Sequence, residues 1–180
     1  MAEIEDTLKE LDRWYNELPG GTDRPKLLAK LAILELCGWL EYRLDSLIFV
    51  VGDTVGIERA WVEGNVVKEN HGFTYQDHLR RMLAKLVGES AMVHLEQTIE
   101  QFNPGMLEQL KGALTTLWKS RGVLAHTHSG ALVVKQQSFN APSWAINQQR
   151  ILSKMIGQFE ASLAVAFRRT IAVPQAAGQP

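Results

Sequence analysis

Four basic side chains lie close together late in the chain, and their types could bind an anion. Lys119, Arg121, His126 and His128 fall within ten residues, although the net charge of the whole chain is only −1. A guanidinium offers paired hydrogen bonds to a phosphate, and an imidazole exchanges a proton near neutral pH. Because the net charge creates no global field for a polyanion, any such site must be a local patch like this one.

Arg121 interrupts an apolar stripe, and this placement leaves two interpretations open. The other members of the stripe are spaced by three or four residues, and they are Leu107, Leu110, Leu114, Leu117 and Leu124. Since desolvation of a guanidinium costs on the order of several kcal/mol, Arg121 must meet a carboxylate, a phosphate or a solvent-filled cleft. A structural ion pair with an acidic residue such as Glu35 or Glu41 fits the pattern as well as an anion site does.

Arg121 and His126 do not share a face of a regular helix, because five positions rotate the side chain by about 140°. They converge if the helix unwinds near Ala125, or if a second copy of the chain supplies one of them. His128 would lie closer to the Arg121 face of a continued helix. His126 and His128 are therefore rival candidates for a working imidazole.

The elements that must position this patch are predicted to be helices. Apolar residues recur at helical spacing over the ranges 3–18, 24–51, 54–65, 74–87, 89–102, 103–125 and 143–170. Pro25, Asn103-Pro104 and Ser143 are helix start signals. Residues 129–141 hold an extended run that we interpret as a loop or small hairpin. The expected fold class is all-α, an up-and-down helical bundle with the long helix 24–51 at its centre or across a dimer interface.

Composition indicates a globular chain, with 46% hydrophobic and 22% charged residues among 180. We expect one domain over 1–172 and a flexible tail over 173–180. A lone cysteine, Cys37, cannot form an intrachain disulfide, and no Cys/His cluster has zinc spacing, so we expect no metal and no cofactor. Ionisable side chains within 27–51 exclude a transmembrane helix, and the acidic N-terminus is unlike a signal peptide. The expected location is cytoplasmic, with no membrane partner.

Three segments resemble one known family. The stretch LWKSRGVLAH over 117–126 resembles the Arg-x4-6-His motif of HEPN domains. The run LAILELCGWLE over 31–41 resembles the early long helix of the RiboL-PSP-HEPN branch, and Ala141-Pro142-Ser143 before the last helix is similar to that branch too. The resemblance covers residues 25–170 in the order of elements.

The resemblance implies a metal-independent endoribonuclease that acts as a homodimer, in the role of a toxin or an antiviral effector. Arg121 and His126 would be the catalytic pair in a cleft shared by two protomers. The imidazole would transfer a proton, and the guanidinium would stabilise the phosphorane formed when the RNA 2′-hydroxyl attacks. We expect Lys119 and His128 to bind RNA beside them, and an antitoxin protein as a further partner.

One position departs from the family pattern. Active members usually carry a polar residue, often Asn or Asp, directly after the motif arginine, and this chain has Gly122 there. An alternative is therefore a non-catalytic HEPN-like module that binds RNA or protein and dimerises. A third interpretation is a helical dimerisation domain in which Arg121 is structural.

Overall fold

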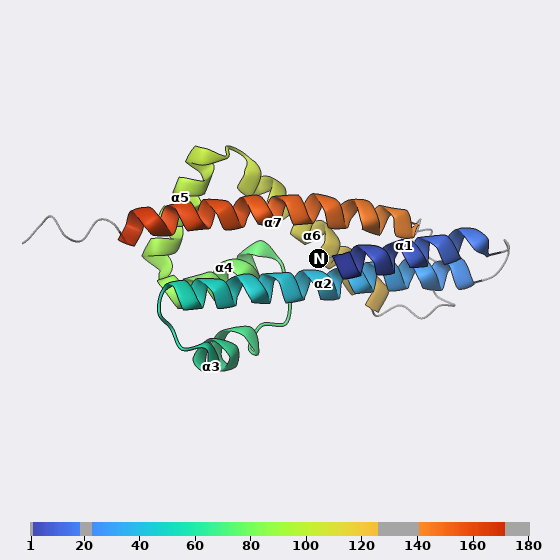
Figure 1. The fold of residues 1–180 in the computed structure, drawn as a ribbon, viewed down its shortest axis with the longest axis horizontal. Coiled ribbons are helices and arrows are strands. Elements are labelled where there is room, and N and C mark those ends of the chain that lie inside the picture. The colour runs from blue at the N-terminus through green and yellow to red at the C-terminus, as the bar shows by residue number, and fades with distance from the viewer. Residues whose placement is uncertain (1, 19–22, 126–140, 172–180) are drawn as a thin grey trace, which may run out of the picture.

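The computed structural model describes residues 2–18, 23–125 and 141–171, and within these ranges all regular structure is helical (Figure 1). The predicted all-α helical bundle is confirmed. The elements are α1 (Ala2–Glu17), α2 (Arg24–Thr54), α3 (Arg59–Val62), the π-helical turns η1 (Glu63–Val67) and η2 (Tyr75–Leu79), α4 (Arg80–Val87), α5 (Glu89–Phe102), α6 (Met106–Ala125) and α7 (Pro142–Ile171). The expected extended run in 129–141, the tail over 173–180, His126 and His128 lie outside the described residues.

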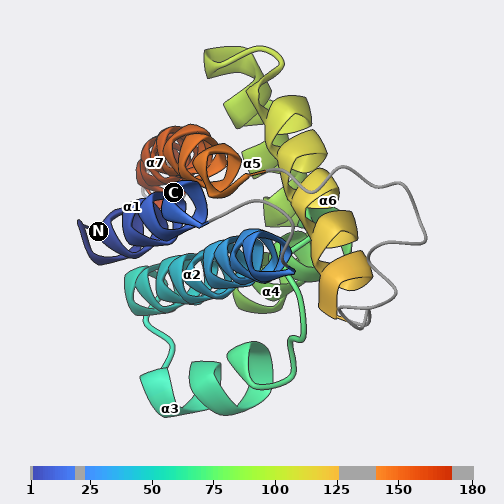
Figure 2. The same cartoon turned by 90° about the vertical axis from the view of Figure 1, so that its right-hand side faces the viewer.

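Two long helices, α2 and α7, form the spine of the molecule. They have 31 and 30 residues, lie side by side and run in the same direction (Figure 1). Helix α1 lies in the trough between them on one face, and α4, α5 and α6 cover the opposite face (Figure 2). Helices α1 and α2 run in opposite directions (Figure 1), whereas α6 crosses the two long helices obliquely (Figure 2).

A single hydrophobic core joins buried side chains from all of these helices. Helix α2 contributes a buried row that includes Leu36, Leu40, Leu44 and Ile48. Each of these side chains is separated from the next by one helical turn, which is why one face of α2 can stay dry along its length. Burial of each large apolar side chain contributes about 1.5–3 kcal/mol to the free energy of folding, and this is the main stabilising contribution of such a core.

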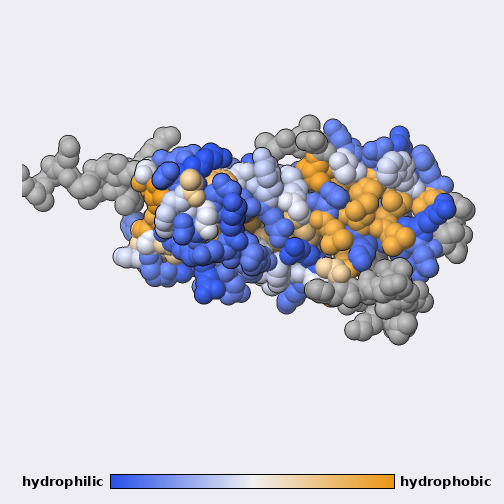
Figure 3. Space-filling view, turned by 90° about the horizontal axis from the view of Figure 1, so that it is seen from below, coloured by the Kyte–Doolittle hydropathy of each residue, from blue (hydrophilic) through white to orange (hydrophobic). Residues whose placement is uncertain are grey.

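One face of α2 stays outside the core. Leu27 and Leu31 are 47% and 41% exposed. They belong to a strip at helical spacing, which we call the α2 strip and which consists of Leu27, Leu31, Leu34, Gly38 and Tyr42. An apolar patch covers this half of the helix in the space-filling view (Figure 3). The sequence predicts this helix at the centre of the bundle or across a dimer interface; one face of α2 lies in the core, and the other is exposed.

Two predicted helix starts differ from the structure. Asn103 is the C-cap of α5 rather than the N-cap of α6, and its side-chain amide donates to Ser162 Oγ at 3.2 Å. Gly105 has a φ of +78°, which a helix cannot contain, so α6 begins only at Met106. Ser143 lies inside α7, whose first residue is Pro142, because proline suits the first helical turn.

Cys37 faces the core from α2 and is only 1% exposed. Burial raises the pKa of its thiol to about 12, so the reactive thiolate is scarce at neutral pH. Cys37 therefore packs as a small buried hydrophobic side chain. Within the described ranges, no helix combines the length and the apolarity that a bilayer span demands.

Candidate functional site

Arg121 projects from α6 toward α2, where it meets a carboxylate. Its Nη1 lies 3.3 Å from Oε1 of Glu41, and the two side chains are 32% and 31% exposed. The guanidinium carbon also lies 5.2 Å from the ring centroid of Trp118, one turn earlier on α6. The ion pair that the apolar stripe predicts is thus present with Glu41, but it is half-exposed rather than buried.

The same guanidinium opens onto a polar pocket of about 250 Å³. Three elements line it, namely α2, α6 and the loop between η1 and η2, through the residues Glu41, Asp45, Asn70, His71, Gly72 and Arg121. Arg121 therefore pairs with Glu41 and also lines the polar pocket.

Asp45 is the second carboxylate of the pocket, one helical turn after Glu41. Burial, and next the negative charge of Glu41, raise the pKa of Asp45 to about 6. Asp45 consequently exchanges a proton close to neutral pH, unlike an ordinary surface carboxyl. A group with such a pKa in a polar pocket can act as a proton donor or acceptor.

The loop that closes the pocket is held by its own hydrogen bonds. The Asn70 side-chain amide donates to the carbonyl oxygen of Gly72 at 2.7 Å. The backbone N–H of Thr74 donates to Nδ1 of His78 at 3.2 Å, so Nδ1 is an acceptor. Burial lowers the pKa of His78, which favours the neutral ring that this hydrogen bond requires. His78 is therefore a residue that positions the loop.

Trp118 fixes α6 against this loop. Its ring packs edge-on against Phe73, with centroids 5.2 Å apart, and at a tilt against His78 at the same separation. With Arg121 over the same indole, the ring is surrounded by packing partners. Trp118 thus anchors the arginine, and stacking on a nucleotide base would require this packing to open.

Of the four predicted basic residues, the structure describes Lys119 and Arg121, and it places these two on different sides of α6. Lys119 is exposed on α6 and does not line the Arg121 pocket, because two helical positions rotate a side chain by about 200°. His126 and His128 lie outside the described residues, and α6 is helical through Ala125. A β-carbon at Gly122 would meet no neighbouring atom within 4 Å, so a polar residue there would fit.

Sequence reasoning missed four residues of the pocket, namely Asp45, Asn70, His71 and Gly72. Asp45 could have been found, because it follows Glu41 by four positions and so shares its helix face. Asn70 and His71 gave no such signal, since they lie in a loop whose approach to α6 depends on tertiary packing.

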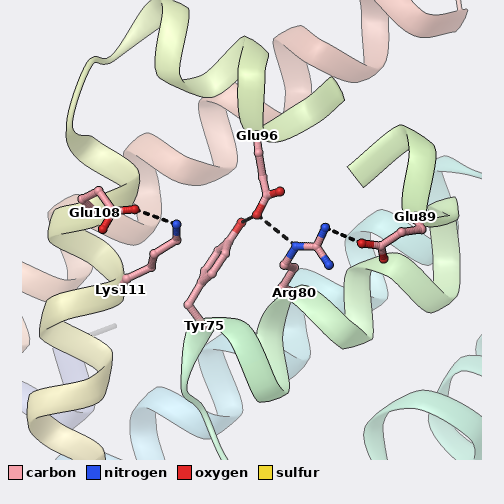
Figure 4. A network of polar contacts seen from close by, with 6 residues as sticks. All are labelled: Tyr75, Arg80, Glu89, Glu96, Glu108 and Lys111. Carbon is pink, nitrogen blue, oxygen red and sulfur yellow. Dashed lines mark hydrogen bonds and ion pairs between the residues drawn. The ribbon is translucent and has the colours of Figure 1, made fainter. Parts of the chain in front are cut away.

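A second group of polar side chains, on η2, α4, α5 and α6, contact one another through hydrogen bonds and ion pairs (Figure 4). Glu96 Oε1 accepts hydrogen bonds from the Tyr75 hydroxyl at 3.0 Å and from Arg80 Nε at 3.1 Å, and Arg80 also pairs with Glu89. Lys111 pairs with Glu108 at 2.7 Å while its Nζ lies 5.4 Å from the Tyr75 ring centroid. The Arg80 side chain is only 13% exposed, so this network holds the helices together and does not offer a basic surface.

No group of three or more His, Cys, Asp or Glu side chains in the described part of the chain is arranged to hold a metal ion. Comparisons of the chain with protein-family models, with curated proteins and with solved structures found no match.

Proposed function

We propose that this protein is a metal-independent endoribonuclease of the HEPN type that acts as a homodimer. The observation that carries the proposal is Arg121, a half-exposed arginine in a polar pocket, five positions before the histidine of the motif. A role as a toxin, with an antitoxin protein as partner, or as an antiviral effector is part of the same proposal.

The guanidinium can contact a phosphate without losing Glu41. An arginine has five N–H donors in a planar fork, and Nη1 is the atom that meets Glu41. A phosphate oxygen entering the pocket can accept from the remaining donors. Glu41 would then hold the guanidinium in place through its contact with Nη1.

The reaction would be a transesterification within the RNA. The 2′-oxygen loses its proton to a base and forms a bond to phosphorus, while the bond to the 5′-oxygen breaks and that oxygen gains a proton. The products are a 2′,3′-cyclic phosphate and a 5′-hydroxyl end. Arg121 would stabilise the charge of the phosphorane, and His126 would carry a proton.

The α2 strip supports the homodimer. It is apolar, follows one helix face and includes Gly38, where a β-carbon would meet no atom within 4 Å. Such a strip can pair with its own copy about a two-fold axis. Glu41 and Asp45 follow Leu34 and Gly38 by seven positions each, so they continue the same face of α2 toward its C-terminal end, and the Arg121 pocket would lie beside the proposed interface.

A second candidate is a non-catalytic HEPN-like module that binds RNA or protein and dimerises. The Arg121–Glu41 ion pair favours it, because the carboxylate offsets the positive charge that an RNA phosphate would meet. Gly122 favours it too, since the polar residue common in active members is missing.

Incubation with a single-stranded RNA oligonucleotide in EDTA separates these candidates. The nuclease predicts cleavage to cyclic-phosphate ends, lost in Arg121→Ala and in His126→Ala. The matched control is Arg43→Ala, because Arg43 also forms a partly exposed interhelical ion pair, with Glu160 at 2.8 Å, but outside the pocket. RNA binding without cleavage would support the module, and full cleavage by Arg121→Ala would exclude Arg121 from catalysis.

A further inference from the structure

Within residues 2–18, 23–125 and 141–171, helix α1 fills only half of the trough between α2 and α7. Helix α1 occupies one half, where Leu8 and Leu11 are buried in the core and Glu5 pairs with Arg150 of α7 at 2.7 Å. Helix α1 begins near the middle of the molecule and runs toward the N-terminal ends of α2 and α7 (Figure 1). No helix of the described part of the chain covers the C-terminal halves of the two long helices on that face.

The uncovered half is an apolar groove of about 740 Å³, which we call the α2–α7 groove. Both long helices line it, through Arg43, Ser46, Leu47, Val50, Val51, Thr54, Glu160, Leu163, Ala164 and Phe167. Leu47 and Leu163 form a nearly dry floor, whereas Val50 on the wall is 61% exposed. An exposed valine beside buried leucines shows that the apolar surface continues past the part that α1 covers.

The electrostatics of the groove define its occupant. Arg43 and Glu160 are the charged residues of the lining, and they pair with each other at 2.8 Å. The groove therefore presents no net charge, and a polyanion would find no basic surface there. An apolar helix face is complementary to it.

We propose that the α2–α7 groove binds an amphipathic helix of a partner protein. This helix would lie in line with α1 and would pack its apolar face between α2 and α7, as α1 does. Helix α1 shows which chemistry the trough accepts, because its apolar residues recur at spacings of three and four over Ile4, Leu8, Leu11 and Tyr15. The partner helix would present large aliphatic side chains with the same spacing and a polar outer face. This inference does not depend on Arg121 or on RNA.

A labelled peptide with the α1 sequence AEIEDTLKELDRWYNE is the probe. We expect it to bind the full chain in fluorescence anisotropy, and Val50→Glu to weaken binding at least about tenfold, as expected for a lost apolar contact of roughly 1.4 kcal/mol. Val93→Glu is the matched control, because Val93 is a similarly exposed valine on α5. A peptide with Leu8→Glu and Leu11→Glu should not bind.

A photoreactive leucine analogue in place of Leu8 of the peptide locates the bound probe. Adducts on 46–54 and 160–167 support the proposal. Adducts on 28–40 would mean that the peptide replaces the chain's own α1 and would overturn it. Absence of binding to the unmodified chain, or equal binding by Val50→Glu, would overturn it as well.

Discussion

The backbone of Gly72 lies directly against the imidazole of His78, so that a β-carbon at position 72 would overlap the ring. The ring in turn receives the Thr74 N–H and packs on Trp118. The loop of the Arg121 pocket is therefore shaped by a contact that only glycine permits.

Gly72→Ala should destabilise the protein by about 1–3 kcal/mol, because a well-packed ring must move. For a chain of this length each kcal/mol shifts the melting temperature by roughly 2–4 °C, which calorimetry resolves. Gly112→Ala on α6 is the control, since a β-carbon there meets nothing within 4 Å and alanine favours the helix by about 0.5–1 kcal/mol. Equal effects of the two substitutions would contradict the close contact.

Arg121→Ala should change the free energy of unfolding by no more than about 1 kcal/mol, because ion pairs with this exposure contribute little. The small loss includes the contact with Trp118. Urea titration of this variant beside Arg43→Ala tests the expectation, since both break an interhelical pair. A loss of 3–5 kcal/mol would instead indicate a tightly buried structural pair.

Asp45→Asn should raise stability at pH 7.5 and have no effect near pH 3.5. The pKa of Asp45 is raised from 3.8 to about 6 by burial and by Glu41, so the folded protein holds a proton that the unfolded chain has lost. Stability therefore falls as the pH rises through this window. Asp45 is half-buried and partly screened, so we expect a rise in melting temperature of only about 1–3 °C at pH 7.5.

Melting curves from pH 3.5 to 8 test this pH dependence, with Asp6→Asn as the control, because Asp6 is 71% exposed on α1. A constant difference between Asp45→Asn and the unmodified chain at all pH values would contradict the raised pKa. A destabilised Asp45→Asn at pH 7.5 would show that the ionised carboxylate makes a favourable contact.

Leu31→Glu should convert the proposed dimer to a monomer, since it places a charge in the middle of the α2 strip. Leu31 is 41% exposed, so the folded protomer should tolerate the substitution. Light scattering at micromolar concentration measures the change in mass, and Val165→Glu, 39% exposed on α7, is the control. A monomeric unmodified chain would exclude dimerisation through the strip.

The helical part of the fold could be predicted because each long helix carries its own apolar period. The segment 89–102 coincides with α5, and 24–51 differs from α2 by three residues at one end. The start of α6 could not be predicted from Asn103-Pro104, because the backbone of Gly105 and the contact with Ser162 decide it. Local cap signals do not report such long-range contacts.

The candidate site was predictable only in part. The conflict between a charge and an apolar stripe identified Arg121, and Glu41 was one of two suggested partners. Arg121 pairs with Glu41 rather than Glu35 because of the way α6 crosses α2. The same crossing brings Asn70 and His71 to the pocket. Lys119 was grouped with Arg121 by closeness in sequence, although a helix places them on opposite sides.

The buried thiol of Cys37 provides a way to measure how fast the folded core opens. Because the thiol is 1% exposed and its pKa is raised to about 12 by burial, an alkylating reagent should modify it only after α2 leaves the core. The labelling rate in excess reagent then equals the opening rate of the protomer. RNA or a partner helix that stabilises the folded protomer would slow that rate, so mass spectrometry of the alkylated Cys37 reports ligand binding without any substitution in the chain.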